Sequence, residues 1–219
     1  MKKYCIIALL LMAFGCRNEA PQLRTGDLIF VGIPQDYSLE EGSMGDAISE
    51  ATGDGELNLI HVAIAEVQGD STWIIDATIR HGVDRHPLDT FLCDFTLKDG
   101  SLPVFIVKRL PDTYDPKPFV EKAKSFCGQP YDVHFLPDNG ALYCSELVKE
   151  SYRSCGTLWL FGDKPMNFRN KDGEIPQYWT QLFALLGEEV PQDVPGTNPQ
   201  DMAASPLLVT VSDDYPLGR

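Results

Sequence analysis

The chain has 219 residues, of which 43% are hydrophobic and 23% charged, so it is long enough and apolar enough to bury one full-sized core. It carries 32 acidic against 18 basic residues, a formal net charge of −14, which argues against nucleic acid as a partner. After residue 15 no apolar run approaches the roughly 20 residues that a transmembrane helix needs. We therefore expect a single water-soluble mature domain.

The N-terminus has the pattern of a bacterial lipoprotein signal. Two lysines open the chain, residues 6–14 are apolar, and small residues lie just before Cys16. This pattern predicts a signal peptide over 1–15 and a lipid on Cys16, which would hold an exported protein to a membrane of the cell envelope, in the periplasm or at the outer membrane. An ordinary cleaved signal peptide is the alternative. Either interpretation leaves 16–219 as one domain.

The predicted elements place strands before helices. A turn and then a strand are predicted over about 24–30, and apolar runs predict strands over about 59–67, 72–78 and 104–110. Apolar residues at helical spacing predict helices over about 43–52, 118–127, 143–155 and 178–186. The second and third strands are joined by a Gly-Asp turn, which predicts an antiparallel hairpin. The order lacks the strand and helix alternation of a parallel sheet, so the expected class is α+β. A tail rich in Pro and Gly follows. We expect it either to wrap around the domain as an extended segment or to be a loose end.

The cysteines favour a working thiol over a metal site. No C-x-x-C pair occurs and no histidine spacing matches a cysteine, so we expect neither a metal nor a cofactor. An exported protein can form disulfides, but four cysteines in a domain of this length are too few for a disulfide framework. The four cysteines of the mature domain are Cys93, Cys127, Cys144 and Cys155.

Cys144 stands at the start of a predicted helix, where amide hydrogens and the helix dipole favour a thiolate. A thiolate nucleophile needs a base, and the base needs a third polar group that orients it. His61 begins one strand of the hairpin and Asp76 lies late on the other. A hairpin centred near residue 69 sets His61 opposite residue 77 and next to Asp76.

A structural interpretation competes with this one. Cysteine is among the most buried residue types, and a histidine at a strand edge usually has a structural role. Asp76 is harder to explain in this way, because a carboxylate within an apolar strand needs a partner. The remaining histidines are interpreted as surface or loop residues, with a place in the pocket wall as the alternative for the last of them. They are His81, His86 and His134.

Five motifs carry a family resemblance. They are GDLIF at 26–30, HVAI at 61–64, IDA at 75–77, PYD at 130–132 and YCSELV at 143–148. In this order they resemble the permuted papain-like amidases of the YaeF/YiiX type, relatives of the NlpC cell-wall peptidases in which the catalytic histidine precedes the cysteine. The resemblance covers nearly the whole mature chain.

The resemblance implies a circularly permuted papain-like α+β fold, in which a nucleophile helix packs on an antiparallel sheet. It implies Cys144 as the nucleophile and His61 as the base. Asp76 falls where the family usually has a glutamate, so its shorter side chain leaves the contact with His61 open. Tyr131 and Ser145 are implied as residues of the oxyanion and substrate pocket. Relatives tend to carry a small polar residue where this chain has an isoleucine before His61.

The leading hypothesis is a thiol hydrolase that cleaves amide bonds through a thioester acyl-enzyme, with a cell-wall peptide or a small N-acyl compound as substrate. A lipid-directed acyltransferase or amidase with the same chemistry is the first alternative. An open polar groove suits peptides, whereas a closed apolar tunnel suits acyl chains. The second alternative is a binding lipoprotein without turnover, which predicts an unreactive Cys144.

Overall fold

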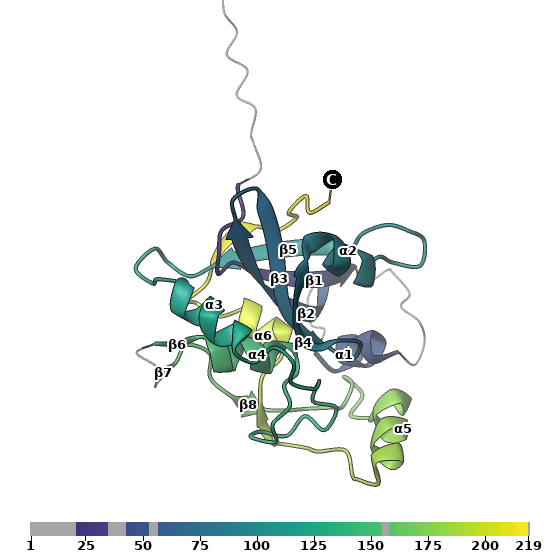
Figure 1. Cartoon of the computed structure of the whole chain (residues 1–219). Helices are drawn as coiled ribbons and strands as arrows, with labels where there is room; N and C mark the ends of the chain where they lie inside the picture. The colour runs from purple at the N-terminus through teal and green to yellow at the C-terminus, as the bar shows by residue number, and fades with distance from the viewer. Residues whose placement is uncertain (1–20, 35–42, 53–56, 155–157, 219) are drawn as a thin grey trace, which may run out of the picture.

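The computed structural model describes residues 21–34, 43–52, 57–154 and 158–218. The expected signal peptide and the lipid-bearing Cys16 lie outside these ranges, as does Cys155. A strongly curved sheet forms the centre, and helices pack against it (Figure 1). Among the described residues, no helix is both long and apolar enough to cross a bilayer.

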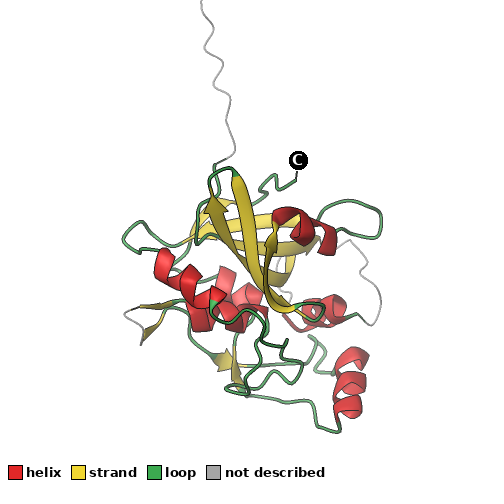
Figure 2. Cartoon of the chain, in the orientation of Figure 1, coloured by secondary structure: helices red, strands yellow, loops and turns green. Residues whose placement is uncertain are grey.

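The central sheet has six strands in the order β10-β5-β1-β2-β3-β4. Figure 2 shows the strands in yellow and the helices that pack around them in red. Every neighbouring pair is antiparallel, and β2, β3 and β4 form a continuous meander. The expected α+β class is confirmed. The strands are β1 (Leu28–Pro34), β2 (Leu57–Gln68), β3 (Ser71–Thr78), β4 (Gly82–Pro87), β5 (Val104–Arg109) and β10 (Val209–Ser212).

The helices lie on both faces of this sheet. On one face α4 packs on β2 and β3 beside α3 and α6. On the other face α2 covers β3 and β4. The loops after α4 contain two short antiparallel strand pairs, β6 with β7 and β8 with β9. The helices are α1 (Met44–Thr52), α2 (Leu88–Asp94), α3 (Lys117–Lys124), α4 (Cys144–Ser151), α5 (Gln177–Leu186) and α6 (Pro199–Ala203), and the short strands are β6 (Arg153–Ser154), β7 (Leu158–Trp159), β8 (Lys164–Pro165) and β9 (Pro195–Gly196).

The side chains of the central strands alternate between two hydrophobic clusters. Phe30 belongs to the cluster that includes Leu147 of α4, whereas its neighbour Ile29 belongs to the one that includes Phe91 of α2. All four side chains are at most 1% exposed, and each contributes about 1.5–3 kcal/mol by burial. The sheet is therefore a rigid, doubly covered support for the residues on its strands.

A third cluster is mainly aromatic and lies beside the start of α4. Phe135 and Phe168 meet Trp179 edge-on, with ring centroids 5.3 and 5.0 Å from it. Phe183 and Tyr143 complete this aromatic cluster. It joins α5 to the residue immediately before Cys144, and so forms one wall of the site.

Several expected boundaries were wrong. The helix expected over 143–155 ends at Ser151, where the serine hydroxyl donates to the Leu147 carbonyl and Tyr152 turns into the core to donate to the Gly26 carbonyl at 3.0 Å. Strand β4 and helix α2 were missed, and the tail after 194 is a wrap that includes α6 and β10. The expected hairpin and the helices over α1 and α5 are confirmed.

Candidate active site

Cys144 is the first residue of α4, and its side chain is buried. The preceding residue, Tyr143, is at the N-cap position and has an extended backbone. Its side chain makes no capping hydrogen bond to the amides of the helix. Glu146, three residues into the helix, accepts a hydrogen bond from the backbone N–H of Tyr143, which is half of a capping box. The amide hydrogens of the first turn are thus left to face the site.

His61 lies on β2 directly after a bulge. Val31 pairs with His61 and Gly32 pairs with Leu59, so Ile60 is an extra residue in β2. A bulge bends its strand and changes the direction of the neighbouring side chain. This irregularity aims His61 toward the end of the sheet at which α4 begins.

The structure brings His61 and Asp76 into contact. The β2–β3 hairpin pairs Gln68 with Ser71 and Ile64 with Ile75, so its centre lies half a residue beyond the expected position. In this register His61 and Asp76 are diagonal neighbours on one face; the expected register would have put them on opposite faces. The His61 Nε2 lies 2.8 Å from the Asp76 Oδ2, so the shorter carboxylate does reach the ring.

His61 also contacts Cys144. Burial alone would lower the pKa of His61, but the negative charge of a Cys144 thiolate and the hydrogen bonds with Asp76 and Cys144 together raise it to about 10. The ring of Phe95 lies 4.6 Å from the imidazole and shields one side of it. At neutral pH this environment favours the protonated, imidazolium form of His61.

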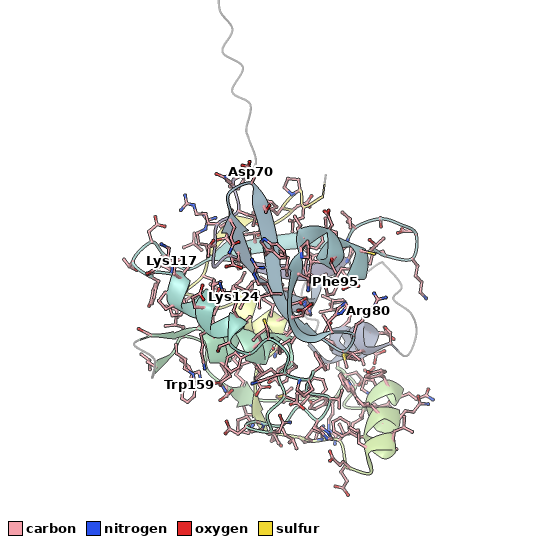
Figure 3. All side chains as sticks on the ribbon, viewed as in Figure 1. Asp70, Arg80, Phe95, Lys117, Lys124 and Trp159 are labelled. Atoms are coloured by element: carbon pink, nitrogen blue, oxygen red, sulfur yellow. The ribbon has the colours of Figure 1, made fainter. Side chains whose placement is uncertain are left out.

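Two hollows meet at Cys144. The first, of about 280 Å³, is open and is lined by His61, Met44, Arg80 and Phe95, of which the last two are labelled in Figure 3. The second, of about 50 Å³, is narrow and apolar and is bounded by the aromatic cluster. The residues that line both hollows are Ile48, Ile60, Tyr131 and Cys144.

Tyr131 and Ser145 both line the second hollow. The Tyr131 hydroxyl donates to the sulfur of Met44 at 3.7 Å, and burial, with the nearby Cys144 charge, raises the pKa of this phenol well above its usual value. It therefore stays protonated and able to donate. The Ser145 hydroxyl is fully buried and accepts a hydrogen bond from Thr197 at 3.0 Å.

The expectation for one histidine was wrong. His86 is not a surface or loop residue: it lies on β4, is buried, and has its Nε2 3.7 Å from Asp76 Oδ1. His81 and His134 are partly exposed and pair with Asp94 and Glu188, and neither lines a hollow at Cys144. Sequence patterns missed His86 because β4 has too few apolar residues to be recognised as a strand.

A charge cluster around Glu66 is separate from this site. Glu66, near the far end of β2, is held by Arg85 and Lys124. Burial alone would raise the pKa of Glu66, but these two cations keep it below its usual value. Cys93, Cys127 and Cys144 are free thiols. Among the described residues, no three His, Cys, Asp or Glu side chains come together as a metal site requires.

Comparisons with known proteins identify the family of this chain. Residues 22–212 match the family model described as permuted papain-like amidase enzyme, YaeF/YiiX, C92 family. The chain belongs to this family. It is therefore a papain-like cysteine hydrolase, and amide hydrolysis is its general activity.

Two similar proteins come from Escherichia coli. One, described as uncharacterized protein YiiX of strain K12, is 24% identical over an alignment of 220 positions that covers 99% of this chain and 98% of the relative. The other is a crystal structure described as metalloprotein yiiX of strain O157:H7, with a TM-score of 0.66 and 22% identity over 88% of this chain and 98% of that chain. The likeness supports the permuted papain-like fold.

Proposed function

We propose that Cys144, His61 and Asp76 carry out amide hydrolysis through a thioester acyl-enzyme. The observation that carries this proposal is the position of His61, which bonds Asp76 at 2.8 Å through Nε2 and has its other ring nitrogen left for the Cys144 thiol. A nucleophile, a base and a group that orients the base are the three parts that this chemistry needs.

The reaction follows from these positions. The Cys144 thiolate attacks the amide carbon, and the resulting oxyanion accepts hydrogen bonds from amides at the start of α4 and from the Tyr131 hydroxyl. The His61 imidazolium gives its proton to the leaving nitrogen as the C–N bond breaks. Neutral His61 then takes a proton from the water that attacks the thioester, and the acid is released with the thiolate and imidazolium restored.

The two hollows have different roles in this proposal. The leaving nitrogen must lie beside His61, which lines only the first hollow, so the amine part of the substrate occupies that open space. The acyl part then occupies the second hollow, whose small volume and apolar walls suit a short acyl group or an apolar side chain. Substrates with these properties include small N-acyl amines and peptidoglycan peptides.

A lipid-directed transferase with the same thioester remains the second candidate. The apolar walls of the second hollow favour it, whereas the hollow's size favours a short acyl group. We further propose that a lipid on Cys16 anchors the enzyme in the cell envelope. The E. coli structure is described as that of a metalloprotein; in the described residues of this chain, no three His, Cys, Asp or Glu side chains are grouped so that they could hold a metal ion.

Iodoacetamide labelling tests the central proposal. The alkylation rate of each cysteine is mapped against pH in the wild-type protein and in His61→Ala, with the exposed free thiol of Cys93 as the internal reference. We expect Cys144 to react faster than Cys93 at pH 6–7, and to slow to the rate of an ordinary thiol in His61→Ala. Equal rates for the two cysteines, unchanged by His61→Ala, would instead support a binding protein without turnover.

A further inference from the structure

Two buried side chains beside the proposed site have polar atoms without a hydrogen-bond partner in the described part of the chain. Asp76 uses Oδ2 for His61, but its Oδ1 is buried and makes no hydrogen bond. Both ring nitrogens of His86 are buried and also unbonded. A buried carboxylate oxygen without a donor is costly, so a group that can supply one has a function here.

The strand register explains why these two side chains face each other. On β3 and β4, Ile74 pairs with His86 and Asp76 pairs with Asp84. Residues 76 and 86 are therefore diagonal neighbours on one face of the sheet. His61 has the same diagonal relationship to Asp76 from β2, on the other side. The carboxylate of Asp76 thus stands between two histidines on three adjacent strands.

The distances are those of a contact that needs only a small shift. The His86 Nε2 lies 3.7 Å from the Asp76 Oδ1, which leaves no room for a water on the line between them. A side-chain movement of less than 1 Å converts this contact into a hydrogen bond. On the opposite side of the ring, Nδ1 lies 3.8 Å from the half-exposed carboxylate of Asp84.

We propose that His86 is a positioning residue for the reaction: its Nε2–H donates to Oδ1 of Asp76 and holds the carboxylate that orients His61. This inference rests on the proposed function of Cys144, His61 and Asp76. It gives both carboxylate oxygens of Asp76 a donor, one on each neighbouring strand. It also requires the ring of His86 to carry a proton on Nε2.

The charged groups around His86 are consistent with this role. Asp76 faces it from β3 and Asp84 from β4. His81, in the turn between these strands, has its ring centroid 6.1 Å away and is itself held by Asp94 of α2. Acidic groups thus lie on both sides of the His86 ring, so each ring nitrogen is near a carboxylate oxygen that can accept a hydrogen bond.

The test compares two substitutions of His86. His86→Leu removes both ring nitrogens, whereas His86→Gln keeps an N–H donor near the position of Nε2. Without a donor on Oδ1, the ionised form of Asp76 is less stable in its buried place, and so is the imidazolium of His61. We expect alkylation of Cys144 at pH 6 to slow about tenfold in His86→Leu, with its pH profile displaced upward by about one unit, and to recover in His86→Gln.

His134→Leu is the matched control, because this histidine pairs with Glu188 away from both hollows. A purely structural role for His86 predicts lower thermal stability in His86→Leu and an unchanged pH profile. That result overturns the inference. If His61→Ala slows alkylation and His86→Leu does not, only the role of His86 fails; if neither matters, the proposed function fails first.

A measurement on the wild-type protein covers the case in which His86→Leu does not fold. Long-range ¹H–¹⁵N correlation spectra report which nitrogen of each imidazole carries the proton, and the spectrum of His86→Gln assigns the His86 signals. We expect a proton on Nε2 of His86. A ring protonated on Nδ1 alone cannot donate to Asp76, and this finding would overturn the inference.

Discussion

Asp76 and His61 lie 15 residues apart in sequence and meet as diagonal neighbours across the β2–β3 hairpin, with Oδ2 2.8 Å from Nε2. Both side chains are nearly fully buried, so the hydrogen bond between them is protected from water. Because Nε2 is held in this way, the other ring nitrogen is the one available to the sulfur of Cys144. The carboxylate therefore acts on the orientation and protonation of the base.

Asp76→Asn tests this relationship. The amide can donate to Nε2 and so select the wrong tautomer of His61, and we expect kcat for hydrolysis of 4-nitrophenyl butyrate to fall by about 10²–10⁴ with a small change in KM. Glu66→Gln is the matched control, since Glu66 is a buried carboxylate held by Arg85 and Lys124. It should lower Tm and leave kcat intact. Equal losses in both variants would contradict a specific role for Asp76.

Tyr131→Phe separates oxyanion binding from nucleophile activation. Alkylation by iodoacetamide forms no oxyanion, whereas ester and amide hydrolysis does. We therefore expect kcat for 4-nitrophenyl butyrate to fall about 10- to 100-fold while the alkylation rate of Cys144 stays the same. The control is Tyr178→Phe, because Tyr178 lies on α5 and lines neither hollow at Cys144. A parallel fall in both rates would assign Tyr131 to the pocket wall.

Two methionines test the roles of the hollows. Met166 lines only the narrow hollow and Met44 only the open one. We expect Met166→Ala to enlarge the acyl space. The kcat/KM for 4-nitrophenyl hexanoate, divided by that for 4-nitrophenyl acetate, should then rise several-fold, because burial of each added methylene contributes about 0.8 kcal/mol. Met44→Ala should leave that ratio unchanged. The opposite pattern would reverse the assignment of acyl and amine parts.

Much of this fold follows from local patterns in the sequence. The hairpin, α1 and α5 have clear period-2 or helical spacing, and the Gly-Asp turn fixes the pairing of β2 with β3. β4 has the sequence GVDRHP, and its polar character conceals a strand that is recognisable only once its pairing with β3 is known. His86 was misassigned for that reason.

The candidate site depends both on local sequence patterns and on tertiary structure. Cys144 and His61 are visible as a cysteine at a helix start and a histidine on a strand. Their contact depends on the bulge at Ile60 and on the packing of α4 against β2, which are tertiary features that spacing alone does not encode. A half-residue error in the hairpin centre was enough to put Asp76 on the wrong face, because side chains alternate with each residue. The family resemblance supplied what the local pattern lacked.

Glu146 gives the stability of the fold a pH dependence. Its side chain is buried in the first turn of α4, and its Oε2 has no hydrogen-bond partner among the described residues. Burial, and then the negative charge of Asp132, raise the pKa of Glu146 from 4.5 to about 8, against the hydrogen bond from Tyr143 and the charge of Lys149. The folded protein therefore favours the neutral carboxyl group.

The sign of the effect follows from proton binding. Between pH 4.5 and 8 the folded state keeps a proton on Glu146 that the unfolded state has lost, so this residue lowers the free energy of unfolding as pH rises through that window. Glu146→Gln removes the titration and retains an acceptor for the Tyr143 N–H. We expect similar Tm values for the two proteins at pH 5 and a Tm about 2–4 °C higher for Glu146→Gln at pH 8.5. Glu174→Gln is the control, because Glu174 is exposed, and it should show no such difference in Tm. A lower Tm for Glu146→Gln than for the wild-type protein at pH 8.5 would instead mean that the charged carboxylate stabilises the start of α4.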